Sequence, residues 1–427
     1  MSEVIQVKLK DIAEVVMGQS PPGDFCNTSK SGIPLLNGPT EFGLYHPVPV
    51  QYTTNPKKHS KVGDLLFCVR GSTTGRMNWS DQTYSIGRGL AAIRSKDGKE
   101  FSSFIKSCIE VALPKLLKAA TGSTFPSVSR DQLESISLRL PSDIEIEFIE
   151  DILGTLEDKI DLNRKTNETL EGIAQALFQS WFIDFDPVRA KSEGGSTGLS
   201  DEISELFPNS FEDSDFGEIP RGWEIGSLGD LVDFQNGYAF KSTDWIEKGV
   251  PVVKIGSIRP GIIDLSNVSY VNSEIANQKA SYRLLPGDIL IGMTGYVGEV
   301  GMVPIGEVSP LMNQRVGKLH PKQVNFKPFV FCWTRSHAFR GKVERLSEGS
   351  AQANISSKNI CSIELALPTH DIFSAFSSLV DDCLERYLLS YRESETLSLL
   401  RDSILPKLIS GELKVHDAEK MLEEVGV

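Results

Sequence analysis

The stretch SKVGDLLFCVRGSTTGRMN, residues 60–78, and the stretch RLLPGDILIGMTGYVGEVG, residues 283–301, share one pattern. Each contains Gly-Asp, then a short apolar run, then a turn rich in glycine. A short apolar run bounded by glycine is typical of a buried β-strand. Because the element occurs once in each half of the chain, it predicts that a domain has been duplicated.

Further matches follow the same order in both halves. They pair LKDIAEVVMG (9–18) with LGDLVDFQNG (228–237), GRGLAAI (87–93) with NQRVGKL (313–319), and SLRLPS (137–142) with ELALPT (364–369). The period fits only twice, which excludes a solenoid of many repeats. We therefore expect an α/β fold of the mixed α+β kind, with two duplicated globular domains at residues 1–141 and 221–368.

A different period follows each globular domain. In residues 144–182 and 371–409, mostly apolar residues recur at steps of seven, which indicates the contact seam of a coiled coil. The predicted seams are Ile149, Leu156, Asn163, Leu170 and Leu177, and Phe376, Cys383, Ser390, Leu397 and Ile404. Ile152, Ile160, Ile173 and Ala174 are expected on the other side of the first stripe. The alternative is a pair of ordinary amphipathic helices, each packed on its own domain.

The two seams are polar at one matched position, Asn163 and Ser390. Buried polar side chains in coiled coils can fix the register of the helices, and we expect that role here. The predicted segments are a central helix at 142–189, an acidic linker at 190–220, and a C-terminal helix with a tail at 369–427.

Charge alternates along the chain with these segments. The net charge is −13, yet residues 1–141 hold 17 Lys and Arg against 12 Asp and Glu, and residues 221–368 hold 16 against 13. Residues 142–220 hold 5 against 20, and residues 369–427 hold 6 against 12. The negative net charge of the whole chain therefore does not argue against binding of nucleic acid, which is densely negative, by the two mildly basic globular domains. The linker is expected to be a solvated loop.

Length and composition indicate a globular protein of two or three domains. No apolar run approaches the roughly 20 residues needed to cross a bilayer, and the first residues lack the layout of a signal peptide. The six cysteines have no metal-type spacing and are expected to be reduced thiols. These features predict a cytoplasmic protein with no membrane partner.

The glycine-rich turns do not match nucleotide-binding loops. A P-loop requires Gly-x-x-x-x-Gly-Lys-Ser/Thr, and neither turn has that lysine. A dinucleotide fingerprint precedes a helix, whereas GEVGMVPIGEVS (298–309) resembles turns and strands. The histidines form no His-Glu-x-x-His motif, and Asp184 and Asp186 follow an aromatic helix end. We predict no catalytic residue and no metal site.

The same turns, with other matched segments, are candidates for DNA contact. Arg can bind guanine, and Asn or Gln adenine, through two hydrogen bonds. The alternative is a structural role in plain β-turns. The candidates are Arg70, Ser72, Thr73, Thr74, Arg76, Arg88, Ser123 and Arg130 in the first half, and Thr294, Tyr296, Asn313, Gln314, Arg315, Gln352, Asn354 and Lys358 in the second.

Three longer stretches resemble a known family. LEDKIDLNRKTNETLEGIAQALFQSWFIDFDPVRAK (156–191) is similar to the central conserved region of specificity (S) subunits of type I restriction–modification systems. LFPNSFEDSDFGEIPRGWEIGSLGDL (206–231) resembles the start of their second target-recognition domain, and LRDSILPKLISGEL (400–413) their C-terminal conserved region. The junctions LPSDIEIEF (140–148) and LPTHDIFSAF (367–376) depart from the family's Pro-Pro-x-x-Glu-Gln-like pattern.

The resemblance implies an arrangement and a function. Residues 1–141 and 221–368 would be target-recognition domains, held apart by two antiparallel helices. Each domain would bind one half of a bipartite double-stranded DNA target, and the coil would set the spacer. Two methyltransferase (modification) subunits, which bind S-adenosylmethionine, would dock on the conserved regions. Two restriction (translocase/nuclease) subunits, which use ATP and Mg, would join them. This chain itself would carry no cofactor and no catalysis.

Three aromatic residues, Trp181, Phe182 and Phe185, end the first long helix. We expect them to form part of a partner or domain contact, and the alternative is local core packing.

Two other functions stay open. The chain could be a coiled-coil scaffold that binds only proteins, or the specificity part of a single-chain restriction–methylation enzyme. The second function would require a cofactor loop and an Asn/Asp-Pro-Pro-aromatic motif, and the sequence has neither.

Overall fold

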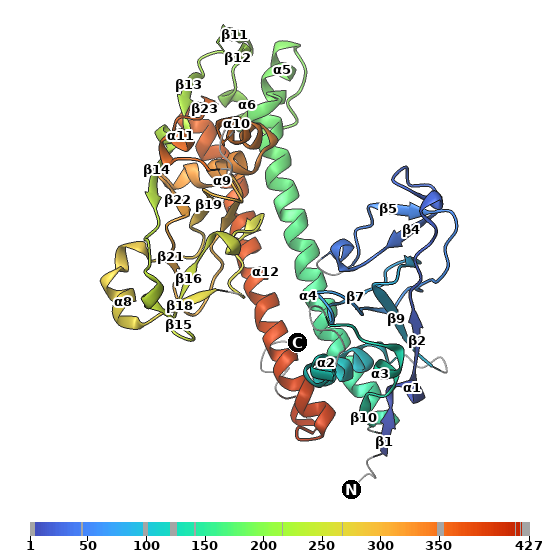
Figure 1. The fold of residues 1–427 in the computed structure, drawn as a ribbon. Coiled ribbons are helices and arrows are strands. Elements are labelled where there is room, and N and C mark those ends of the chain that lie inside the picture. The colour runs from blue at the N-terminus through green and yellow to red at the C-terminus, as the bar shows by residue number, and fades with distance from the viewer. Residues whose placement is uncertain are drawn as a thin grey trace. The chain divides into compact units, whose positions relative to one another are not determined.

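The computed structural model describes residues 5–43, 46–96, 101–119, 126–140, 142–215, 217–266, 268–347, 354–414, 416–418 and 420. The chain divides into two compact units (Figure 1). Unit 1 consists of Met1–Leu162 and Glu395–Val427, and unit 2 of Asn163–Ser394. Unit 1 is therefore built from two separate segments of the chain.

Unit 1 contains two four-stranded sheets and a strand pair. Its strands are β1 (Ile5–Lys8), β2 (Ala13–Met17), β3 (Cys26–Asn27), β4 (Ile33–Leu36), β5 (Gln51–Thr53), β6 (Leu65–Cys68), β7 (Met77–Trp79), β8 (Ser85–Ile86), β9 (Leu90–Ser95) and β10 (Ser137–Leu140). The sheet orders are β2-β9-β6-β7 and β3-β5-β4-β8, and β1 pairs with β10. The quoted apolar run forms β6, whose residues are all buried.

Unit 2 repeats these sheets. Its strands are β11 (Phe211–Ser214), β12 (Gly217–Pro220), β13 (Glu224–Ser227), β14 (Val232–Asn236), β15 (Trp245–Ile246), β16 (Val250–Val253), β17 (Gly261–Ile262), β18 (Ser269–Val271), β19 (Ile289–Gly292), β20 (Val300–Met302), β21 (Leu311–Met312), β22 (Val316–Pro321) and β23 (Glu364–Leu367). The orders β14-β22-β19-β20-β17, β15-β18-β16-β21 and β13-β23 match unit 1 strand for strand, with β17 added. The predicted duplication is confirmed.

The repeated Gly-Asp pair has a structural explanation. Gly63 and Gly287 adopt φ values of 83° and 78°, a left-handed conformation that glycine adopts without strain. The Asp64 carboxylate accepts the N–H of Lys61 at 2.8 Å and pairs with Arg94 at 2.7 Å. Asp288 repeats both contacts, with the N–H of Leu285 and the ammonium of Lys318 at 2.7 Å each. In each unit the Gly-Asp pair closes the turn before a central strand, β6 or β19. The aspartate also ties this turn to the neighbouring strand, β9 or β22.

Replacing Asp64 by asparagine is expected to lower the free energy of unfolding of unit 1 by about 2 kcal/mol, because Arg94 loses a charged hydrogen-bond partner that is buried. Burial raises the pKa of Asp64, while the Lys61 hydrogen bond and Arg94 act in the opposite direction. The control is Glu14→Gln, since the half-exposed Glu14 lies 3.8 Å from the same guanidinium. That variant should lose less than about 0.5 kcal/mol in urea unfolding. Equal losses would contradict the assignment.

Each unit also contains shorter helices. They are α1 (Leu9–Ile12), α2 (Ser102–Ala119) and α3 (Arg130–Glu134) in unit 1, and α5 (Asp186–Ser192), α6 (Asp201–Leu206), α7 (Leu228–Leu231), α8 (Ser273–Gln278), α9 (Lys327–Arg335), α10 (His337–Ser347) and α11 (Ser357–Cys361) in unit 2. Of these helices, α2 and α9 pack on the sheets. In unit 1, Phe104 of α2 shares a core with Phe67 of β6. In unit 2, Phe329 of α9 shares a core with Ile289 of β19.

The two predicted long helices are α4 (Asp143–Phe178) and α12 (His370–Ser410). In unit 1, Ile149 of α4 lies in one core with Ile404 of α12. In unit 2, the ring of Phe178 lies 6.3 Å from that of Phe376. Thus the start of α4 accompanies the end of α12, and the end of α4 accompanies the start of α12. The helices are antiparallel. Each end also packs on the sheets of the unit to which it belongs. The repeat therefore reflects both pairing of the two helices and packing on the globular domains.

Most of the predicted seam is buried. Leu170, Leu177 and Cys383 are half-buried. The buried seam residues are Ile149, Leu156, Asn163, Phe376, Ser390, Leu397 and Ile404. The prediction for Ile173 is wrong, because this side chain is 45% exposed while Ala174 is buried. Consecutive helical residues point in different directions, and here the smaller one faces the core.

The polar position of the seam has a partner across the helix pair. The Asn163 amide donates to the Glu393 carboxylate at 2.8 Å. Ser390 is buried as well. A role for Asn163 and Ser390 in fixing the register stays a prediction.

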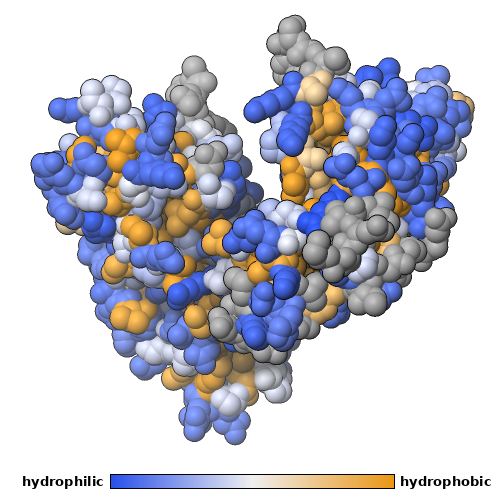
Figure 2. Space-filling view, turned by 90° about the horizontal axis from the view of Figure 1, so that it is seen from below, coloured by the Kyte–Doolittle hydropathy of each residue, from blue (hydrophilic) through white to orange (hydrophobic). Residues whose placement is uncertain are grey.

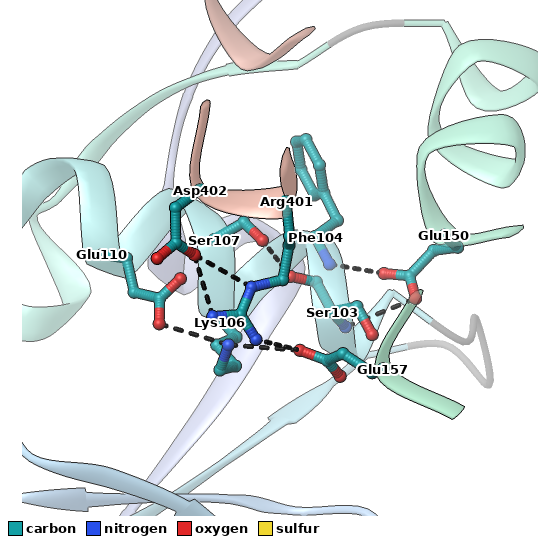
Figure 3. A network of polar contacts seen from close by, with 9 residues as sticks. All are labelled: Ser103, Phe104, Lys106, Ser107, Glu110, Glu150, Glu157, Arg401 and Asp402. Carbon is teal, nitrogen blue, oxygen red and sulfur yellow. Dashed lines mark hydrogen bonds and ion pairs between the residues drawn. The ribbon is translucent and has the colours of Figure 1, made fainter. Parts of the chain in front are cut away.

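Figure 3 shows polar contacts that join α2 to the long helices in unit 1. The Glu150 carboxylate of α4 accepts the N–H groups of Ser103 and Phe104, at 3.3 and 2.6 Å. It satisfies groups in the first turn of α2 that have no partner within the helix. Burial raises the pKa of Glu150, and these hydrogen bonds act in the opposite direction.

The same network reaches α12. Lys106 of α2 lies 3.2 Å from both Glu110 and Glu157. Arg401 of α12 lies 2.8 Å from Asp402 and 3.9 Å from Glu157 (Figure 3). Side-chain contacts therefore tie α2, α4 and α12 together in unit 1.

The aromatic end of the first long segment belongs to the core of unit 2. Trp181 and Phe182 lie in a π-helical turn, Gln179–Ile183, and are 1% and 4% exposed. The Phe182 ring lies 5.0 Å from that of Phe376. The Phe182 ring also lies 4.9 Å from that of Phe329 in the second globular domain, and Trp181 shares this core. The predicted domain contact and core packing are therefore both confirmed, whereas a direct partner contact through these buried rings has no support. Phe185 is half-buried, and a partner contact there stays a prediction.

Residues 190–220 are not a plain solvated loop, and that expectation is wrong. They include the end of α5, α6, and the hairpin of β11 and β12. Phe207 is buried, with its ring 5.0 Å from that of Trp181, and Ile219 is buried in the same core. The acidic composition of this segment is typical of a solvated loop, so the sequence alone did not identify Phe207 and Ile219 as core residues.

The thiols are free, and three are fully buried. Cys68, Cys108 and Cys332 are buried, and Cys26, Cys361 and Cys383 are half-buried. Burial raises the pKa of Cys108 to about 12. On the face in Figure 2, apolar residues occur in small groups among hydrophilic ones. Within the described residues, no helix is long and apolar enough to cross a membrane.

Candidate nucleic-acid interface

In unit 1, three segments that carry candidate residues meet at the end of β6. The N–H of Val69 donates to the carbonyl of Gly89 at 2.9 Å, and the N–H of Val128 donates to the carbonyl of Val69 at 2.9 Å. Arg70 and Ser127 form an antiparallel bridge. We call this arrangement of residues 69–76, 87–89 and 126–130 the first loop junction.

Unit 2 builds the same junction at the end of β19. The N–H of Met293 donates to the carbonyl of Arg315 at 3.1 Å, and the N–H of Ile355 donates to the carbonyl of Met293 at 3.0 Å. Thr294 and Asn354 form the bridge. Residues 293–299, 313–315 and 354–358 are the second loop junction. The structure thus gathers candidates that the sequence placed in three separate segments.

Some candidates have contacts that give them a structural role. Thr74 is buried, and its hydroxyl lies 2.8 Å from the carbonyl oxygens of Gly71 and Pro126. DNA contact by Thr74 is therefore wrong, since its hydroxyl closes the junction.

Two arginines are also held by internal contacts. The Arg76 guanidinium donates to the carbonyls of Pro39 and Phe42, at 3.3 and 3.2 Å. Arg130 donates to the carbonyl of Val15 at 2.6 Å and to Glu134 at 2.8 Å. Both side chains are exposed, and each uses two of its five N–H donors in these internal hydrogen bonds.

In the second junction, Thr294 donates to the Asn354 side chain at 2.8 Å, so these two candidates contact each other. Tyr296 is 57% exposed. Asn313 is half-buried, and its backbone bridges Tyr238.

The remaining candidates are exposed side chains. Arg70, Ser72, Thr73 and Arg88 are exposed in the first junction, and Gln314, Arg315 and Lys358 in the second. Ser123 and Gln352 lie outside the described residues. Each junction therefore presents cations beside hydroxyl or amide groups, a combination suited to phosphates and base edges.

Sequence reasoning missed two glycines that shape the junctions. Gly18 and Gly237 end the matched stretches quoted above, and each packs directly on the backbone of a junction turn. A Cβ at Gly18 would lie 2.1 Å from the carbonyl oxygen of Gly87, and one at Gly237 2.0 Å from that of Asn313. Their place at the end of an apolar stretch, at equivalent positions in both halves, was the available signal.

The described residues hold no cluster of three or more His, Cys, Asp or Glu arranged to hold a metal ion. The exposed polar groups of the junctions are Arg, Lys, Ser, Thr, Asn, Gln and Tyr side chains. Side chains of these kinds can hold a ligand through charge and hydrogen bonds.

Comparison with known proteins adds an independent line of evidence. The family described as "Type I restriction modification DNA specificity domain" matches residues 1–172 and 220–385. The chain is 28% identical over 406 residues to the HindI specificity subunit of Haemophilus influenzae, covering 84% of this chain and 88% of that protein. It is 24% identical over 428 residues to the MjaIX specificity subunit of Methanocaldococcus jannaschii, covering 96% and 93%.

A solved structure shares the fold. The type I restriction–modification S subunit from M. genitalium aligns over 95% of this chain and 96% of that chain, with a TM-score of 0.53 at 16% identity.

Proposed function

Because the chain belongs to the family of type I restriction–modification DNA specificity proteins, we propose that each of its two recognition units binds one half of a bipartite DNA target. Unit 1 uses the first loop junction and unit 2 the second. The paired helices α4 and α12 set the spacer between the two half-sites. The chain is the specificity subunit of its system, with two copies of the DNA specificity domain.

The observation that carries the proposal is the repeated junction. Both copies of the domain place exposed cations, Arg70 and Arg88 in one and Arg315 and Lys358 in the other, on loops fixed by the same backbone hydrogen bonds. Duplication of a binding surface with different side chains suits two half-sites of different sequence. Arg side chains suit guanine, and Gln314 suits adenine.

The proposal assigns catalysis to partner subunits. Two modification subunits would bind S-adenosylmethionine and methylate adenine, and two restriction subunits would use ATP and Mg. In this account the chain itself holds no cofactor and acts in the cytoplasm, where the DNA lies. The surfaces of α4 and α12 outside the seam, with Phe185, are the proposed docking regions for these partners.

DNA binding by the complex of this chain with its modification subunit tests the proposal. Binding should weaken steeply as salt rises, because phosphate contacts release counterions. It should also be tighter for a duplex with the complete target than for one in which either half is scrambled. Binding that depends on neither sequence nor salt would contradict the proposal and favour a scaffold that binds only proteins.

A further inference from the structure

We propose that Tyr238 and Lys279 of unit 2 form a phosphate-binding site beside the second loop junction, in which the Lys279 ammonium binds a phosphate of the DNA backbone. This inference rests on the proposed function, because DNA phosphate reaches the site only if unit 2 binds DNA. Neither residue belongs to the glycine-rich turns.

Tyr238 is fixed next to the turn that carries Gln314 and Arg315. Its N–H donates to the carbonyl of Met312 at 2.9 Å, and its backbone forms a parallel bridge with Asn313. The preceding Gly237 donates its N–H to the carbonyl of Val316 at 3.0 Å. Backbone contacts on both sides of the turn therefore hold Tyr238 in place.

The Tyr238 ring packs among other aromatic rings, and the ammonium group of Lys279 lies over it. Its centroid lies 5.4 Å from that of Tyr282 and 5.0 Å from that of Phe240. Lys279 Nζ lies 4.3 Å from the same centroid.

The segment that bears Lys279 is anchored as well. The Gln235 side chain donates to the carbonyl of Ser281 at 2.8 Å, which ties the residues after α8 to β14. A cation over an aromatic ring is attracted to it by the negative face of the ring.

The ring orients the Lys279 ammonium without neutralising its charge. In the described part of the chain, Nζ contacts this ring and no carboxylate. Such a cation retains its full attraction for an anion. Beside a turn that would contact base edges, the anion available is a phosphate of the same duplex.

Unit 1 also has a lysine beside its junction, although at the position of Tyr282 and not of Lys279. The N–H of Gln19 donates to Ile86 at 2.9 Å as that of Tyr238 donates to Met312, so Gln19 replaces Tyr238. His59 bridges Ser85 as Arg283 bridges Leu311, so Lys58 replaces Tyr282. Lys58 is exposed. A lysine therefore lies beside each junction. Among the described residues, only the lysine in unit 2 lies over an aromatic ring.

The test is the salt dependence of DNA binding by the complex of full-length chain and modification subunit. The probes are a duplex that carries the methylated target and a scrambled duplex of equal length. Lys279→Gln should weaken both complexes and reduce the slope of log K against log salt by about 1, with no change in the methylated motif. Lys248→Gln, which removes an exposed lysine from the turn between β15 and β16, should leave the slope unchanged.

Two further variants separate charge from packing. Tyr238→Phe keeps the ring and should bind as the wild type does, whereas Tyr238→Leu should reduce the salt slope partway toward that of Lys279→Gln. If Lys279→Gln leaves the slope unchanged in a complex that binds its target specifically, this inference is overturned and the proposed function stands. An altered methylated motif would overturn the assignment to phosphate. Failure of the wild-type complex to bind either duplex would overturn the proposed function and this inference with it.

Discussion

Replacement of Gly237 by alanine is expected to lower the free energy of unfolding of unit 2 by about 3 kcal/mol or more. The added Cβ would lie 2.0 Å from the carbonyl oxygen of Asn313, 2.4 Å from its carbonyl carbon and 2.9 Å from the carbonyl oxygen of Met312. All three are backbone atoms at the end of β21, so no side-chain rotation relieves the clash. Overpacking of this kind costs about 1–3 kcal/mol in a core, and more where backbone must move.

Gly172→Ala is the matched control in the same unit. Gly172 lies within α4, and a Cβ there would meet nothing within 4 Å. Alanine should stabilise the helix by about 0.5–1 kcal/mol, because glycine loses more backbone entropy on folding. Urea unfolding followed by tryptophan fluorescence reports mainly on unit 2, since Trp181, Trp223, Trp245 and Trp333 lie there and Trp79 in unit 1. Similar unfolding midpoints for the two variants would contradict the close packing of Gly237 on the turn.

The second large effect concerns target choice. Arg88→Gln and Arg315→Gln are each expected to weaken binding of the complete target by about 1–3 kcal/mol, because each removes an arginine suited to a bidentate guanine contact. Each substitution should relax only one half of the target, since the residues belong to different recognition units. Methylation mapping of each variant checks this outcome directly.

Arg76→Gln is the control for these substitutions. Its guanidinium donates to the carbonyls of Pro39 and Phe42, so its loss should reduce the stability of unit 1 and leave the target unchanged. Relaxation of both halves by Arg88→Gln, or of one half by Arg76→Gln, would contradict the division of the junctions into binding and structural side chains.

The duplication was predictable because short sequence motifs recur in the same order in both halves of the chain. Gly-Asp before an apolar run requires a turn with a left-handed glycine and a carboxylate that caps it, and both halves retain this requirement. The seven-residue repeat predicted the long helices for the same reason, since helix periodicity is a property of short segments. The sequence indicated only that the three segments of each junction recur in the same order. Their contact in space depends on hydrogen bonds between residues far apart in sequence.

Tertiary packing decided the features that sequence reasoning missed. Ile173 and Ala174 are adjacent, and only the position of neighbouring helices determines which one faces the core. Phe207 and Ile219 anchor a segment whose acidic composition is typical of a solvated loop. The hydroxyl of Thr74 was a candidate for DNA contact by its position in the turn, but the turn itself uses that hydroxyl. Lys279 lies outside every quoted motif and reaches Tyr238 only through the fold.

Genome-wide mapping of methylated bases tests the central claim most directly. The chain would be produced with its modification subunit in a host whose DNA is otherwise unmethylated, and the modified positions would be sequenced. Two recognition units that each bind one half-site predict a single split motif with a fixed gap between its halves. A continuous motif, or no methylation by a complex that is folded and assembled, would contradict the account.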